Sequence, residues 1–181
     1  RLVVGGFDRV FEIGKSFRNE GVFSRHNPEF TMLESYQAYG NFNDLINHCK
    51  NLIQVSASSL TKTWNCKVDF SQFKIITMYG AVQTALIQSI EYCINDELEL
   101  VSCPYPFPKN RFPGKESLKI LKIVNSNLSY GEKLFQLFEL VAEPYLAEDY
   151  RSADGQLSLP VIITQHPVEI SPLARKSDSD P

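Results

Sequence analysis

The sequence predicts an α+β fold with a mainly antiparallel sheet flanked by helices. Two segments with strand-like alternation, residues 10–20 and 30–36, come first and are joined by a long loop over 21–29. Helical spacing of apolar residues dominates the middle of the chain, and an apolar, β-branched run, Val161–Thr164, follows near the end. This order of strands, then helices, then a strand is typical of an α+β domain.

Length and composition are those of an ordinary globular protein. The chain has 181 residues, 43% of them hydrophobic and 22% charged, which is enough to build one core. The net charge is -3 and the pI is about 5.7. This balance argues against a domain whose main task is to coat nucleic acid, and it leaves room for a local contact.

Cysteine and histidine usage shows no metal-binding or disulfide pattern. The four cysteines form no CxxC pair and only three histidines are present, so free thiols in a reducing cytoplasm are the favoured interpretation. No apolar run reaches the roughly 18 residues that span a bilayer, and no signal peptide is visible. We therefore expect a cytoplasmic protein with no membrane partner and no metal ligands in this segment.

The two alternating segments carry an unusual set of side chains for strands. In the first segment one face carries Phe11, Ile13, Lys15 and Phe17, and the other carries Val10, Glu12, Gly14, Ser16, Arg18 and Glu20. In the second segment one face carries Phe30, Met32, Glu34 and Tyr36. A hairpin that pairs the last two sets would place a guanidinium, carboxylates, a flat ring, a thioether and a phenol on one surface.

Such a surface suits a ligand with several chemical parts. The Arg18 guanidinium matches a phosphate or carboxylate with two hydrogen bonds, and the Phe30 ring can stack on a flat heterocycle. Carboxylates and the Tyr36 hydroxyl can accept from an ammonium group. A nucleotide together with an amine-bearing substrate would satisfy all of these groups.

A plainer interpretation stays open at this point. In a solvated antiparallel sheet Arg18, Glu20 and Glu34 would simply form cross-strand ion pairs, each worth at most about 1 kcal/mol. A single loop histidine such as His26 is by itself most often a solvated or capping residue.

Helices are predicted over most of the middle of the chain. One begins near Phe42 with Asn41 or Asn43 as its N-cap, and its apolar stripe is Phe42, Leu45, Ile46, Cys49, Leu52 and Ile53. A short strand is predicted at 66–70. Thr77 then caps a second helix, whose apolar face is Val82, Leu86, Ile90 and Cys93 or Ile94.

Prolines divide the rest of the chain. Residues 103–117 contain four prolines and a glycine and predict a loop, followed by a short helix facing inward through Leu118, Leu121 and Val124. A stronger helix is predicted over 132–146, with a kink or end at Pro144 and an inward face of Leu134, Leu137, Phe138 and Val141. Residues 147–158 are polar and predict a surface loop.

The charged hairpin also carries a family resemblance. "FRNE" at 17–20 followed by "RHNPEFTMLESYQAY" at 25–39 resembles motif 2 of class II aminoacyl-tRNA synthetases in its lysyl-tRNA synthetase form, and "PVEISPLARK" at 167–176 is a second match. The resemblance implies that residues 1–181 are part of a class II catalytic domain. It divides them into a motif 2 hairpin at about 8–38, a helical middle at about 41–147, and a strand with the PVEISPLARK segment at about 160–176.

The resemblance also implies a role for each matching residue. Arg18 would be catalytic, binding the α-phosphate of ATP and the carboxylate of lysine and offsetting charge in the transition state. The residues implied to bind ATP are Arg18, Glu20, His26, Asn27 and Phe30. Those implied to bind lysine are Arg18, Glu34 and Tyr36, with Glu34 on the α-amino group and Tyr36 on the ε-amino group.

A family enzyme would activate L-lysine with ATP and Mg²⁺ and pass the lysyl group to tRNA(Lys). The resemblance places motif 1, motif 3, the anticodon-binding barrel and most Mg²⁺ ligands outside this segment, and implies a homodimer for the full-length protein. Because the chain begins at Arg1 rather than Met, we expect an excised piece with little or no activity alone.

Several alternatives stay open on sequence alone. One is the related enzyme that attaches lysine to elongation factor P, and another is a non-catalytic synthetase-like binding or regulatory module. Aspartyl- and asparaginyl-tRNA synthetases share the "PEFT" run but not "PVEISPLARK". A locally basic stretch is either a solvated face or a contact for the tRNA acceptor stem; it contains Lys109, Arg111, Lys115, Lys119 and Lys122.

Overall fold

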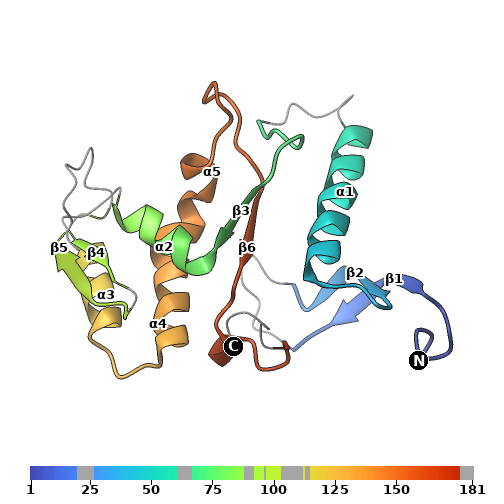
Figure 1. Ribbon diagram of the computed structural model, residues 1–181, viewed down its shortest axis with the longest axis horizontal. Coiled ribbons are helices and arrows are strands. Elements are labelled where there is room, and N and C mark those ends of the chain that lie inside the picture. Colours follow the sequence, from blue (N-terminus) through green and yellow to red (C-terminus); the bar gives the residue numbers. More distant parts are fainter. Residues whose placement is uncertain are drawn as a thin grey trace. The chain divides into compact units, whose positions relative to one another are not determined.

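The computed structural model describes residues 1–19, 27–60, 67–87, 92–95, 97–102, 112 and 115–175 (Figure 1). Its strands are β1 Arg9–Phe17, β2 Glu29–Gln37, β3 Lys74–Thr77, β4 Tyr92–Ile94, β5 Leu100–Ser102 and β6 Val161–Thr164. Its α-helices are α1 Phe42–Leu60, α2 Met78–Ile87, α3 Lys115–Val124, α4 Tyr130–Leu137 and α5 Leu146–Asp149. The chain forms two compact units, Arg1–Leu52 and Ile53–Pro181.

The first unit is built on an antiparallel hairpin of β1 and β2. The register is unbroken from Arg9 opposite Gln37 to Phe17 opposite Glu29. The Arg18 N–H donates to the Pro28 carbonyl at 2.9 Å, which continues the ladder by one residue. Both strands are the ones that the alternation predicts, because an alternating pattern has the period of the pleat.

Helix α1 begins at the predicted residue, and its cap is Asn41 rather than Asn43. The Asn41 side-chain oxygen accepts from the N–H groups of Asn43 at 2.8 Å and Asp44 at 3.2 Å. The Asp44 carboxylate accepts in return from the Asn41 N–H at 2.8 Å. This reciprocal pair satisfies N–H groups that the first helical turn leaves without partners.

The second unit contains a strand pairing that the sequence did not predict. Strands β3 and β6 are parallel, with Lys74 opposite Val161 and Thr77 opposite Thr164. The predicted antiparallel pairing is confirmed for β1 with β2 and for β4 with β5. The predicted strand at 66–70 is reduced to a single bridge between Val68 and Ser158, and Cys66 lies outside the described residues.

The core of this unit is apolar and centres on α2, α4 and the π-turn Phe138–Ala142. Figure 1 shows α2 and α4 beside each other, next to the β3–β6 pair. Thr77 caps α2 as predicted, since its hydroxyl oxygen accepts from the Gly80 N–H at 2.9 Å. The predicted inward residues of α2 and α4 are confirmed as buried; they are Val82, Leu86, Leu134, Leu137, Phe138 and Val141.

The predictions for this unit were partly wrong. Cys93 and Ile94 belong to β4, because α2 ends at Ile87, and Ile90 lies outside the described residues. The kink or end predicted at Pro144 is confirmed by a 3-10 turn at Glu143–Tyr145, where Pro144 has no N–H to donate, although the π-turn at Phe138–Ala142 already interrupts the predicted helix. The first residues of the predicted loop at 147–158 belong to α5, which ends at Asp149. Most of the predicted loop at 103–117 lies outside the described residues.

The inward face of α3 also differs from the prediction. The helix begins at Lys115 and buries Ile120, which is 1% exposed, while Leu118 is 59% and Leu121 is 43% exposed. Ile123 and Val124 pack against the core beside Ile120. The prediction is therefore confirmed for Val124 and was wrong for Leu118 and Leu121, because α3 has apolar residues on more than one side.

The first turn of α4 contacts the PVEISPLARK segment. The Glu169 carboxylate accepts from the Gly131 N–H at 3.4 Å, and a side chain at Gly131 would overlap Glu169 and Pro167.

The Ser129 hydroxyl and N–H both donate to the Glu132 carboxylate at the start of α4, which lowers the pKa of Glu132. The stabilisation from this cap is therefore present above the usual carboxyl pKa and is lost as the pH falls through the lowered one.

We predict that Leu137→Ala lowers the free energy of unfolding of this unit by about 2 to 5 kcal/mol, because Leu137 is 0% exposed and the change leaves a cavity. The matched variant Leu118→Ala removes the same atoms from a side chain that is 59% exposed, so its effect should stay within about 0.5 kcal/mol. Urea unfolding measures both. Equal losses in the two variants would contradict the assignment of the core.

Candidate functional site

The register of the hairpin brings the two chemically unusual faces together. Residues directly opposite each other in an antiparallel pair project to the same side of the sheet. The directly opposed pairs on this face are Val10 with Tyr36, Glu12 with Glu34, Gly14 with Met32 and Ser16 with Phe30. We call these eight residues and Arg18 the ligand face.

At one end of the ligand face Arg18 and Phe30 are in contact. The central guanidinium carbon of Arg18 lies 5.5 Å from the centroid of the Phe30 ring, which is within the range of a cation–π interaction. Phe30 is half-buried, whereas Arg18 is exposed. The contact holds a charged fork next to a flat aromatic surface, as binding of a phosphate beside a heterocycle requires.

Glu34 and Tyr36 lie toward the other end of the same face. Glu34 is six residues along β2 from Pro28, the residue opposite Arg18, so their backbones are about 20 Å apart at about 3.4 Å per residue. Both side chains are exposed. The structure therefore brings Arg18 and Phe30 together and sets Glu34 and Tyr36 apart from them along one extended surface.

A second carboxylate on this face was not singled out from the sequence. Glu12 is directly opposite Glu34, and both are exposed. Like charges opposite each other across two strands are destabilising, and a bound cation between them would remove that cost. The signal was present in the alternation, which places Glu12 on the same face as Arg18, but the pairing with Glu34 requires the register.

Three predicted ATP-binding residues belong to the hairpin loop or directly precede it in the sequence. Glu20 and His26 lie outside the described residues. Asn27 is described, is exposed and comes immediately before Pro28. Their roles stay predictions.

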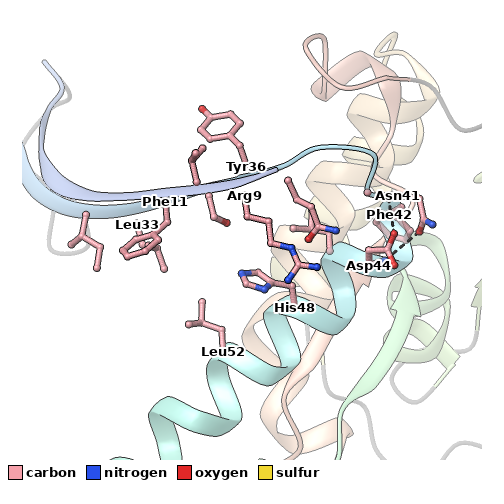
Figure 2. Close-up of a pocket in the computed structure, with 15 residues that line it drawn as sticks. Arg9, Phe11, Leu33, Tyr36, Asn41, Phe42, Asp44, His48 and Leu52 are labelled. Atoms are coloured by element: carbon pink, nitrogen blue, oxygen red, sulfur yellow. Dashed lines mark hydrogen bonds between the residues drawn. The ribbon is translucent and has the colours of Figure 1, made fainter. Parts of the chain in front are cut away.

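The opposite face of the hairpin carries apolar residues that line a groove with α1, and it also carries the exposed Lys15–Glu29 ion pair at 2.6 Å. Figure 2 shows Phe11 and Leu33 on one side of the strands and Tyr36 on the other. The groove has a volume of about 700 Å³, and Phe42, Leu45 and Leu52 of α1 also line it. These α1 residues belong to the predicted apolar stripe, of which Ile46 is buried at 8% exposure. The hairpin thus has the ligand face on one side and, on the other, a face whose apolar part lines the groove, to which Tyr36 of the ligand face also contributes.

Two further properties of the described residues bear on function. Within the parts of the chain that the structure describes, no three His, Cys, Asp or Glu side chains are grouped so that they could hold a metal ion. None of the helices in these parts has the length and apolar character needed to cross a membrane.

Comparison with known proteins gives a family for the whole chain. The model of the family described as tRNA synthetases class II (D, K and N) matches residues 1–181. The chain belongs to this family of class II tRNA synthetases. The placement of the hairpin as motif 2 of this family stays a prediction.

Three similar proteins carry the name lysine–tRNA ligase. The chain is 36% identical to the lysine–tRNA ligase of Xylella fastidiosa over 188 residues, covering 100% of this chain and 32% of that protein. For the lysine–tRNA ligase of Haemophilus influenzae the identity is 37%, with 100% of this chain and 33% of that protein covered. For that of Aliivibrio fischeri it is 34%, with 99% and 34% covered. The chain spans about a third of the length of these class II synthetases.

The register can be tested directly with paired cysteines. We predict that Phe11→Cys with Ser35→Cys forms a disulfide under mild oxidation, because these residues are directly opposite and share a face. The matched pair Phe11→Cys with Glu34→Cys places its thiols on opposite faces and should stay reduced. Peptide mapping by mass spectrometry distinguishes the two, and the reverse result would show a register shifted by one residue.

Proposed function

We propose that the full-length protein containing this chain is a lysine–tRNA ligase. It would activate L-lysine with ATP to form lysyl-adenylate and then transfer the lysyl group to tRNA(Lys). The observation that carries the proposal is the ligand face, which presents Arg18 against Phe30 at one end and Glu34 opposite Glu12 at the other. Membership of the class II family and the names of the similar proteins support it.

The ATP end of the site would be formed by Arg18 and the residues around the loop. The Phe30 ring offers a surface for adenine, and the adjacent Arg18 fork would bind the α-phosphate with two hydrogen bonds. Glu20 would accept from the adenine amino group. His26 and Asn27 would lie near the pyrophosphate and adenine. These assignments place the reacting phosphorus next to Arg18.

The lysine end would be formed by exposed acceptors. Glu34 would accept from the α-amino group and Tyr36 from the ε-amino group, while the carboxylate of lysine would point toward Arg18. Glu12 adds a second carboxylate opposite Glu34, so an ammonium group there would separate two like charges. Because the α-amino and carboxylate groups of lysine are bonded to the same carbon, the side chains of Arg18 and Glu34 would reach toward each other across the roughly 20 Å between their backbones.

Catalysis would depend on positioning and on charge stabilisation. An oxygen of the lysine carboxylate attacks the α-phosphorus, the bond to pyrophosphate breaks, and pyrophosphate leaves with the electron pair. Arg18 would stabilise the negative charge that develops on the phosphoryl oxygens. In the second step a ribose hydroxyl of the tRNA attacks the lysyl carbonyl, and AMP leaves. No covalent intermediate with the enzyme is needed.

Mg²⁺ would neutralise phosphate charge in the family reaction. The resemblance places most of its ligands outside this segment. The dimer and the cytoplasmic location expected from the resemblance belong to the same proposal.

We predict that Arg18→Ala in the full-length protein lowers lysine-dependent exchange of pyrophosphate into ATP by at least about 10²-fold, because it removes a transition-state charge contact. The matched variant Arg9→Ala changes an arginine that lines the groove on the other face, and it should retain exchange. Unchanged exchange in Arg18→Ala would contradict the assigned role. Transfer of lysine to elongation factor P in place of tRNA(Lys) would identify the related enzyme instead.

A further inference from the structure

Helix α3 carries three lysines on one side. Lys115, Lys119 and Lys122 follow each other at intervals of four and three residues, which places them within about 60° of one another around the helix at about 3.6 residues per turn. All three are exposed. We call them the lysine stripe; it lies in the second unit and contains no residue of the ligand face.

The opposite side of α3 is fixed to the core. Ile120 is 1% exposed, and Ile123 and Val124 pack against the same core. The Ser117 hydroxyl donates to the carbonyl of Phe112, a buried residue just before the helix. The lysine stripe is therefore presented outward from a rigid support.

The charge of the stripe is not neutralised within the described residues. None of its lysines forms an ion pair with a carboxylate in the part of the chain that the structure describes. Glu116 is three residues before Lys119 and lies about 60° from it around α3, and Glu139 of α4 shares a shallow surface groove with Lys119 and Lys122. In a chain with a net charge of -3, α3 still carries three lysines and a single glutamate, which is a local excess of positive charge.

We propose that the lysine stripe binds the phosphate backbone of the RNA substrate. The first and last lysines are about 10 Å apart along the helix at about 1.5 Å per residue, and a nucleic acid strand carries one phosphate every few Å. Each lysine can therefore meet a different phosphate as a point charge, without reading sequence. The choice of RNA as the polyanion rests on the proposed function.

The test compares two double variants of the full-length protein with equal changes in net charge. Lys119→Gln with Lys122→Gln removes two lysines of the stripe. Lys67→Gln with Lys74→Gln removes two exposed lysines from outside α3. For each protein, the affinity for tRNA(Lys) is measured over a range of salt concentrations, together with lysine-dependent pyrophosphate exchange.

We expect the α3 variant to bind tRNA more weakly at low salt. The slope of log affinity against log salt should become shallower by about 2, because about one counterion is released per phosphate contact. Its exchange activity should equal that of the unchanged protein. The control variant should keep the original affinity and slope, and Lys119→Arg with Lys122→Arg should keep most of the affinity.

Two outcomes would overturn the proposal. One is an unchanged affinity and slope in the α3 variant. The other is loss of binding to phosphatidylserine vesicles with unchanged tRNA binding, which would assign the stripe to a membrane surface. Absence of lysine-dependent exchange in the unchanged protein is a separate result, which contradicts the proposed function and leaves the tRNA-binding comparison valid.

Discussion

The antiparallel register of β1 and β2 is the constraint on which the candidate site depends. It places Glu12 opposite Glu34 and Ser16 opposite Phe30, and so collects the polar recognition groups on one face. A slip of one residue would move every side chain of one strand to the other face. Arg18 would then lie on the apolar side, and its contact with Phe30 would be lost.

The two faces of the hairpin have opposite physical roles. The face with Phe11 and Leu33 lines the groove that α1 also borders. Its apolar residues recur at every second position, which is the pattern that predicts the strands. The ligand face contains an unfavourable arrangement, since the two carboxylates of Glu12 and Glu34 are directly opposed. Such a local conflict is typical of a site shaped for binding rather than for stability.

Sequence patterns predicted the parts that depend on local chemistry. The alternation predicted both hairpin strands, and the short polar side chains of Asn41 and Thr77 predicted two helix starts, because capping is decided within a few residues. Sequence did not predict the parallel pairing of β3 with β6, which joins segments far apart in the chain. It also assigned Leu118 to the inward face of α3, whereas tertiary packing buries Ile120 and leaves Leu118 exposed.

For the candidate site, residue types were predictable but their spacing was not. Arg18, Phe30, Glu34 and Tyr36 follow from alternation and from the family resemblance, whereas the opposition of Glu12 and Glu34 requires the register. The same register turns a set of isolated groups into a surface about 20 Å long, with the Arg18–Phe30 contact at one end and Glu34 opposite Glu12 at the other. The separation of these two ends along the hairpin is the central claim about the site.

The most direct test is a structure of the full-length protein with a non-hydrolysable analogue of lysyl-adenylate. The account predicts adenine on the Phe30 ring, the phosphate analogue against Arg18, and the amino groups of lysine near Glu34 and Tyr36. Binding of the analogue on the opposite face, against Phe11 and Leu33, would contradict it.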